Sequence, residues 1–153
     1  MFSFLLTFHS LFRWLVLFSL ILSIITAYRG WKGGSAFTSA ANSIRHWTAT
    51  TAHLQLFIGV TIYFQSPTVM YSMTVGIHQL TVEQAFFKYI HIILMLLAVV
   101  LITIGSAKAK RIATARAKYR TMLIWFIIAL LVIIIAIPWP FSFLASRPYF
   151  RAL

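Results

Sequence analysis

Four ionisable side chains lie within long apolar stretches of this chain, and they are its first candidates for chemistry. They are His9, Arg13, His53 and His91. An ionisable group is expensive to bury in a hydrophobic segment, so by default it marks a functional site. An imidazole can hold a metal or a haem iron, or carry a proton. A guanidinium stays protonated and needs an anion.

The three histidines differ in their depth along these stretches. His9 and His91 each lie five residues beyond the phenylalanine that begins their stretch, which is roughly 7–8 Å at 1.5 Å per helical residue. His53 lies eleven residues from Phe64, roughly 16 Å on the same scale. Two histidines at one depth on parallel helices can supply both axial ligands of a haem. We therefore predict His9 and His91 as the haem iron ligands, with His53 as a group beside the site or as the alternative ligand.

The predicted haem also provides a partner for Arg13, which is one helical turn from His9. The only acidic side chain in the chain is Glu83, so a buried Arg13 has little choice of anion within the protein. A haem brings two propionates. The rival partner for Arg13 is a lipid phosphate, reached by extending the side chain towards the membrane surface.

Other interpretations of the same histidines stay open. A single histidine inside a membrane is more often an interhelical hydrogen-bonding residue than a ligand. His9, His53 and His91 could instead hold one zinc or copper ion, although their difference in depth conflicts with ligand distances of about 2 Å. The chain has no cysteine, which excludes disulfides, thiolate metal sites and covalent c-type haem attachment.

The elements that must position these residues are four hydrophobic blocks. The composition is 61% hydrophobic and only 9% charged, which is too apolar for a soluble domain of this length. Each block has about the 20 residues that span a bilayer, and in lipid such a segment must be helical. The sequence therefore predicts an all-α polytopic membrane protein, a single transmembrane domain over residues 1–153. We expect an antiparallel bundle of four transmembrane helices at about 4–28, 46–65, 84–106 and 120–139.

Helical spacing groups the polar residues into stripes that we expect to face the bundle interior, because lipid offers them no partner. The stripes comprise His9, Arg13, Val16 and Leu20 in the first helix, His46, Thr50, His53 and Phe57 in the second, and His91, Met95, Ala98, Ile102 and Gly105 in the third.

Basic residues gather in the two connections predicted on one side of the bundle. They are Arg29, Lys32 and Arg45 in the first connection, and Lys108, Lys110, Arg111, Arg116, Lys118 and Arg120 in the second, against Lys88, Arg147 and Arg151 on the other side. The positive-inside rule then puts both connections in the cytoplasm and both termini outside. We interpret the net charge of +12 as orientation and attraction to anionic lipids on the cytoplasmic side, and not as nucleic-acid binding.

Several short motifs, spread over nearly the whole chain, resemble a family of short four-helix bacterial membrane proteins labelled cytochrome b-like. The motifs are His9-Ser10-Leu11-Phe12-Arg13-Trp14, then Ala52-His53-Leu54-Gln55-Leu56 with Gly59, then His91, Met95 and Ala98 before Leu101-Ile102-Thr103-Ile104-Gly105, and finally Ile137-Pro138-Trp139-Pro140-Phe141 and Arg147-Pro148-Tyr149-Phe150. The resemblance implies a haem protein of the bacterial inner membrane. Members often carry an acid before the third-helix histidine. This chain has Ile90 there, so no carboxylate is expected to orient His91.

Together these features predict a membrane-embedded b-type haem protein that transfers electrons. It would act between a quinone or a periplasmic partner and a larger complex, with another membrane subunit as its partner, and not as a stand-alone enzyme. Two hypotheses of other classes stay open. One is a non-catalytic accessory or assembly subunit whose polar residues fix helix packing. The other is a transporter or proton-relay component, which the lack of acids and of broken helices disfavours.

Overall fold

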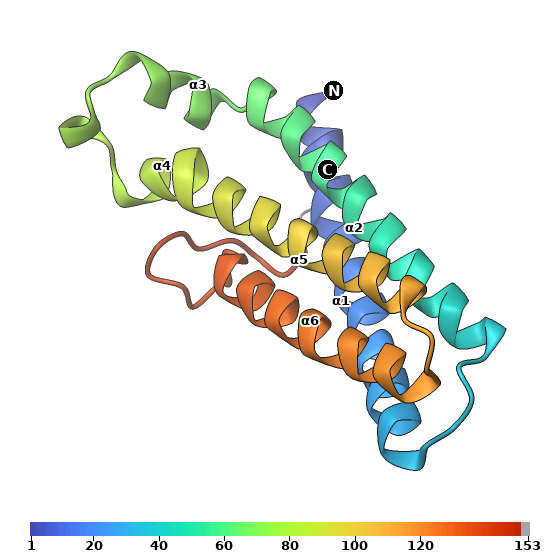
Figure 1. Cartoon of the computed structure of the whole chain (residues 1–153). Helices are drawn as coiled ribbons and strands as arrows, with labels where there is room; N and C mark the ends of the chain where they lie inside the picture. The colour runs from blue at the N-terminus through green and yellow to red at the C-terminus, as the bar shows by residue number, and fades with distance from the viewer. Residues whose placement is uncertain (151–153) are drawn as a thin grey trace.

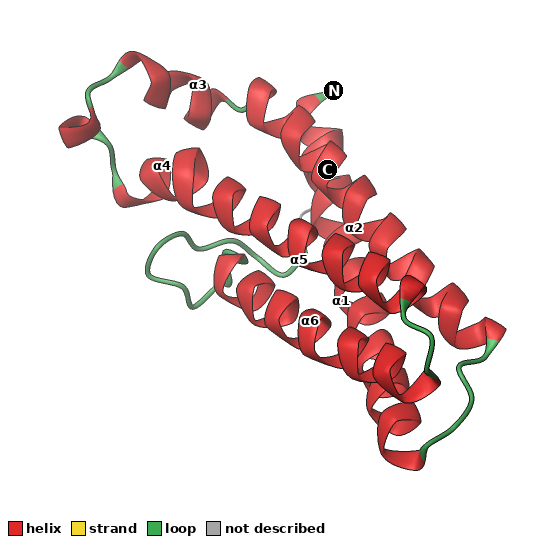
Figure 2. Cartoon of the chain, in the orientation of Figure 1, coloured by secondary structure: helices red, strands yellow, loops and turns green. Residues whose placement is uncertain are grey.

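The computed structural model describes residues 1–150, and these residues form helices and connections without any strand (Figures 1 and 2). Arg151, one of the basic residues predicted on the outer side, lies outside the described residues. The helices, in chain order, are α1 (Phe2–Gly33), α2 (Ser39–Gln65), α3 (Pro67–Thr74), the 3₁₀ turn η1 (Ile77–Gln79), α4 (Val82–Ala85), the π-helical turn η2 (Phe86–Ile90), α5 (His91–Arg111) and α6 (Ala115–Ala136). The prediction of an all-α fold is confirmed.

Three of the described helical segments are long and apolar enough to cross a membrane. They are Phe2–Gly33, Val82–Arg111, which runs through α4, η2 and α5 without a break, and Ala115–Ala136. Their outward surfaces are apolar, as Phe18, Leu131 and Ile135 show with more than half of their surface exposed. Because such a surface is unfavourable in water, these segments suit a lipid environment. The remaining long helix, α2, is less apolar because it carries several polar residues.

The helix ends differ from the predicted ones. Helix α1 continues to Gly33 and ends at Gly34, whose left-handed φ of 62° suits glycine. Helix α2 begins at Ser39, where the Thr38 hydroxyl accepts a hydrogen bond from the Ala41 N–H at 3.1 Å. Most of the basic residues that we predicted in connections therefore lie in the terminal turns of helices. Helix α6 ends at Ala136, earlier than predicted, because Ile137 precedes a proline and is extended.

The third long helical segment begins at Val82, two residues before the predicted start. The Gln84 N–H donates to the Thr81 hydroxyl at 3.2 Å, and the Gln84 side chain accepts from the Thr81 N–H at 2.9 Å. This reciprocal pair is a capping box. It begins the continuous helical segment that leads to His91.

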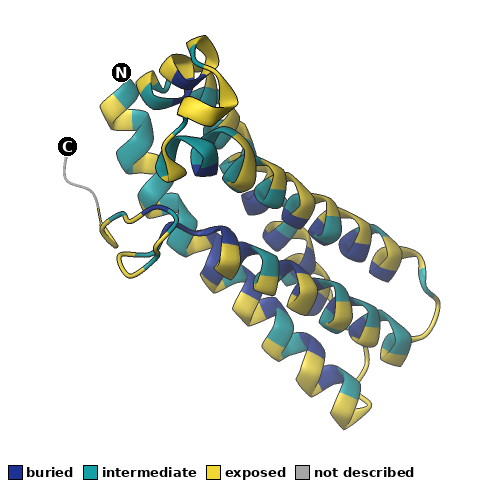
Figure 3. Cartoon of the chain, turned by 90° about the vertical axis from the view of Figure 1, so that its left-hand side faces the viewer, coloured by how far each residue is buried: buried dark blue, intermediate teal, exposed yellow. Residues whose placement is uncertain are grey.

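The four long helices surround a shared interior, and each packs against two of the others (Figure 1). Helix α1 packs against α2 and α6, and α5 also packs against α2 and α6. Helices α1 and α5 therefore lie diagonally across the interior. The buried core includes Leu20, Ala98, Ile102, Met122 and Phe126. Figure 3 shows the buried positions on the inward faces of the helices and the exposed ones on the outward faces.

Two of the three predicted inward stripes are confirmed, and the one on α2 is wrong. Leu20 and Ile102 are fully buried, whereas Phe57 on the α2 stripe is 73% exposed. The buried face of α2 instead carries Arg45 and Thr48. The Thr48 hydroxyl lies 2.7 Å from the Ser23 hydroxyl of α1, and the Arg45 guanidinium donates to the carbonyl and hydroxyl of Ser106 on α5. Hydrogen-bond partners on the neighbouring helices therefore decide which face of α2 turns inward.

Candidate functional site

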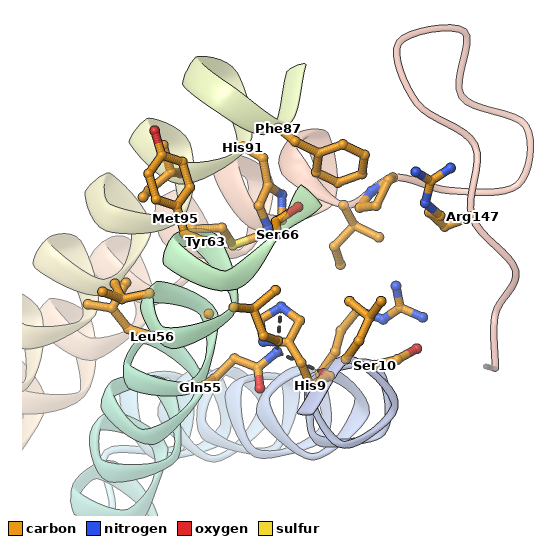
Figure 4. A pocket seen from close by; sticks show the side chains of 18 of the residues that line it. His9, Ser10, Gln55, Leu56, Tyr63, Ser66, Phe87, His91, Met95 and Arg147 are labelled. Carbon is orange, nitrogen blue, oxygen red and sulfur yellow. Dashed lines mark hydrogen bonds between the residues drawn. The ribbon is translucent and has the colours of Figure 1, made fainter. Parts of the chain in front are cut away.

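A cavity of about 350 Å³ lies at the end of the molecule opposite the basic helix ends, enclosed by α1, α2, the η2–α5 segment, the end of α6 and the C-terminal segment (Figure 4). Its lining includes three of the predicted site residues, His9, Arg13 and His91, but not His53. The cavity volume lies within the range of about 300–1,000 Å³ that is typical of small-molecule sites. In Figure 4 the His9 and His91 side chains project into the cavity from opposite walls.

His91 is held in a defined orientation by the backbone of α6. Its Nδ1 lies 2.8 Å from the Ala136 carbonyl oxygen, so Nδ1–H donates and Nε2 is left with its lone pair. This carbonyl is available because residue 140, which would donate to it in a continued helix, is a proline without an N–H. A carbonyl that orients a ligating imidazole is the usual support behind a metal-bound histidine. The Ala136 carbonyl thus orients the His91 ring, which Ile90, in place of an acidic residue, cannot do.

A π-helical turn directly precedes His91. Residues Phe86–Ile90 form this turn, and the His91 N–H donates to the Phe86 carbonyl oxygen. Such turns are rare within α-helices and often occur at functional sites. A π-helical turn contains one residue more than an α-helical hydrogen-bonded turn. It therefore rotates the helix that follows and sets the direction in which the His91 side chain points. The Phe86 and Phe87 rings flank the imidazole, with centroids 5.7 and 6.0 Å from it.

His9 lacks a strong hydrogen-bond partner on either ring nitrogen. Its Nδ1 is buried without any partner among the described residues. Its Nε2 lies 3.4 Å from the Gln55 amide nitrogen, which donates a shorter bond of 3.0 Å to the His9 carbonyl oxygen. The Gln55 carbonyl oxygen is also buried and unpaired. An unsatisfied buried polar group costs about 1–3 kcal/mol, so a polar group bound at this wall of the cavity would relieve that cost.

Arg13 is the third unsatisfied side chain on the same wall. Its Nη2 donates to the Tyr149 carbonyl oxygen at 2.8 Å, and its Nε is buried without a partner. Arg147 also lines the cavity and forms an ion pair with Glu83. Because Glu83 is the only acidic side chain in the sequence, Arg13 has no carboxylate side chain to pair with. The cavity therefore offers one guanidinium without an acidic partner, that of Arg13, to an anionic ligand.

His53 lies apart from this cavity. It is exposed on the outer face of α2, and its Nε2 is 3.0 Å from the Thr103 hydroxyl of α5. The described residues contain no group of three histidine, cysteine or acidic side chains placed to hold a metal ion, so the three-histidine zinc or copper site does not form. The structure instead adds Gln55 and Arg147 to the site. Gln55 is two residues from His53 in the same motif, and helical geometry turns it to a different face.

The residues around this cavity fit a haem in their chemistry. The imidazoles of His9 on α1 and His91 on α5 line the same cavity. His91 has one ring nitrogen free, and His9 has no strong hydrogen-bond partner. Arg13, which has no acidic partner, suits a carboxylate of the porphyrin. Apolar side chains such as Val16, Ala98 and Ile102 line the deeper part. The imidazoles, the guanidinium and the apolar side chains together suit an amphiphilic, anionic ligand that binds imidazole.

Comparison with known proteins found no match, whether against protein-family models, curated proteins or solved structures.

Proposed function

We propose that this chain is a membrane-embedded b-type haem protein that transfers electrons, with His9 and His91 as the residues that hold the iron. The observation that carries the proposal is the pair of imidazoles, one on α1 and one on α5, that line the same cavity without strong partners for the nitrogens that a metal would need. A bound haem would supply reversible one-electron chemistry at its iron.

The remaining residues of the site support this assignment. Arg13 would neutralise a propionate, and Gln55 would hold the His9 backbone through its amide. Two histidine ligands would occupy both axial positions, which favours electron transfer over oxygen chemistry. The Ala136 carbonyl would keep the Nδ1 proton of His91 and so direct Nε2 towards the iron.

The proposed setting is the inner membrane of a bacterium, with the four long helices as an antiparallel bundle that spans it. The excess of Lys and Arg at one end supports a cytoplasmic location for that end, near anionic lipids, and an outer location for both termini and the cavity. A single haem near the outer surface could exchange electrons with a quinone or a periplasmic partner. It could not carry electrons across the bilayer alone, so the proposal includes another membrane subunit.

The absorption spectrum of the detergent-purified full chain, oxidised and dithionite-reduced, tests the proposed cofactor. We expect a sharp α-band in the reduced protein and about one haem b per chain in a pyridine haemochrome assay. A colourless protein from haem-sufficient cells would contradict the proposal. That result would favour the accessory-subunit hypothesis, which the hydroxyl pairs Ser19–Thr51 and Ser23–Thr48 between α1 and α2 also support.

The proposed topology has its own test, because the chain has no native cysteine. We expect His78→Cys to react with a membrane-impermeant maleimide added outside intact spheroplasts, since His78 lies at the end proposed to face outwards. Arg116→Cys, at the basic end, should react only after the membrane is permeabilised. Labelling of Arg116→Cys in intact spheroplasts, with His78→Cys protected, would invert the proposed orientation.

A further inference from the structure

A second concave site, of about 370 Å³, lies at the basic end of the molecule, far from the histidine cavity. It is lined by Thr26, Arg29, Gly30, Ser35, Ala36, Thr38 and Tyr119, and we call it the Arg29 pocket. Its residues come from the last turns of α1, the α1–α2 connection and the first turns of α6. Nothing in the proposed electron-transfer function uses it.

The Arg29 pocket is held open by the packing of Tyr119. The Tyr119 hydroxyl donates to the Ala36 carbonyl oxygen at 3.0 Å, and its ring lies 4.9 Å from the Phe37 ring, centroid to centroid. The ring also lies against Gly30, where a side-chain Cβ would overlap it. Because the ring is fixed from three sides, the concavity exists before any ligand binds.

Several polar groups of the pocket are hydrogen-bond donors without partners among the described residues. The Arg29 guanidinium and the hydroxyls of Thr26 and Ser35 make no hydrogen bond or ion pair among the described residues. The Thr38 hydroxyl accepts from the Ala41 N–H, which leaves its own hydrogen to donate. An exposed guanidinium and hydroxyl donors that line the same pocket match the oxygens of a phosphate.

The surroundings of the pocket favour a negatively charged ligand. Nine of the 13 Lys and Arg residues of the chain lie at this end, namely Arg29, Lys32, Arg45, Lys108, Lys110, Arg111, Arg116, Lys118 and Arg120. Glu83 lies at the opposite end, in an ion pair with Arg147. The cationic group of a zwitterionic head group would be repelled by these basic residues. An anionic head group brings no such cation.

The position of the pocket along α1 matches the head-group layer of a membrane. From Phe4, a hydrocarbon core of about 30 Å ends after roughly 20 helical residues, near residue 24. Arg29 lies about 7–8 Å beyond that point at 1.5 Å per residue. The head-group layer extends roughly 5–8 Å from the hydrocarbon, so on this count the Arg29 backbone falls within that layer.

We propose that the Arg29 pocket binds the phosphate group of an anionic phospholipid in the leaflet at the basic end. The inference requires that the chain is embedded in a membrane, but it does not depend on haem binding. Free inorganic phosphate shares the same chemistry, and competition between phosphate and lipid separates the two sources.

Native mass spectrometry of the detergent-purified full chain, titrated with phosphatidylglycerol or phosphatidylcholine, tests this proposal. We expect preferential binding of phosphatidylglycerol, which Arg29→Gln weakens by more than about tenfold, because the variant removes a charge-assisted hydrogen bond as well as a charge. Lys110→Gln is the matched control because it removes the same charge at the same end outside the pocket. It removes only the general attraction of one basic residue, so it should raise the dissociation constant by no more than about fivefold.

Three results would overturn the inference. Equal affinity for the two lipids would show that the pocket does not select an anion. Equal losses in Arg29→Gln and Lys110→Gln would show diffuse attraction instead of a site. Displacement of phosphatidylglycerol by millimolar phosphate, with potassium chloride of matched ionic strength as the control, would assign the pocket to a soluble anion. Circular dichroism of both variants checks that the helices are intact.

Discussion

Replacing His91 by alanine is expected to remove the reduced haem α-band almost completely. The variant deletes one of the two proposed axial ligands, together with the hydrogen bond from Nδ1 to the Ala136 carbonyl oxygen. Loss of a group that merely orients a metal ligand costs roughly 10- to 100-fold in affinity. Loss of the ligand itself should therefore lower haem affinity by at least about 100-fold. The haem content per chain, measured by the pyridine haemochrome assay, reports this loss.

His53→Ala is the matched control, because His53 lies outside the cavity and bonds to Thr103. We expect it to keep the full haem content. His9→Ala should lose the band as His91→Ala does, and added imidazole should restore part of it in either variant if the helices are intact. A His91→Ala protein that keeps its haem while His53→Ala loses it would show that the ligands are assigned wrongly.

The largest effect on stability is expected from Gly105→Ala in α5. A Cβ at Gly105 would overlap the Cβ of Trp125 on α6. That atom is at the root of the tryptophan side chain, so relief requires α5 and α6 to move apart. Overpacking of this kind costs about 1–3 kcal/mol. We expect the free energy of unfolding to fall by about that amount, measured by reversible SDS denaturation in mixed micelles and followed by circular dichroism.

Gly33→Ala provides the comparison, since a Cβ at Gly33 meets no atom within 4 Å. It lies in the last turn of α1, where alanine should be neutral or stabilise the helix by up to about 1 kcal/mol. If both alanine variants changed stability equally, close packing at Gly105 would not hold α5 against α6.

The sequence by itself determined the helices and most of their inward faces. The apolar blocks around His9, His91 and Leu131 are long enough to span a bilayer and can satisfy their backbone only as helices. Along α1 and α5, the 3.6-residue period placed His9, Arg13 and His91 on the same faces as the buried Leu20 and Ile102. Helical spacing and depth grouped His9 with His91, and both residues line one cavity in the structure.

Other parts of the site depended on long-range contacts. Periodicity shows which residues of α2 share a face, but not which face turns inward. The inward turn of Arg45 and Thr48 follows from acceptors on α5 and α1. This rotation excluded His53 from the cavity and brought Gln55 into it. A sequence pattern that treats every histidine of a span as an interior residue cannot anticipate this outcome.

The tertiary structure also decided how His91 is oriented and how the C-terminal segment is used. The Ala136 carbonyl reaches the imidazole from another helix, and Arg147 reaches both the cavity and Glu83 from the last part of the chain. Local sequence determines helices because their hydrogen bonds join residues four apart. It does not determine these contacts, which join residues 45 and 64 positions apart and exist only once the helices have packed.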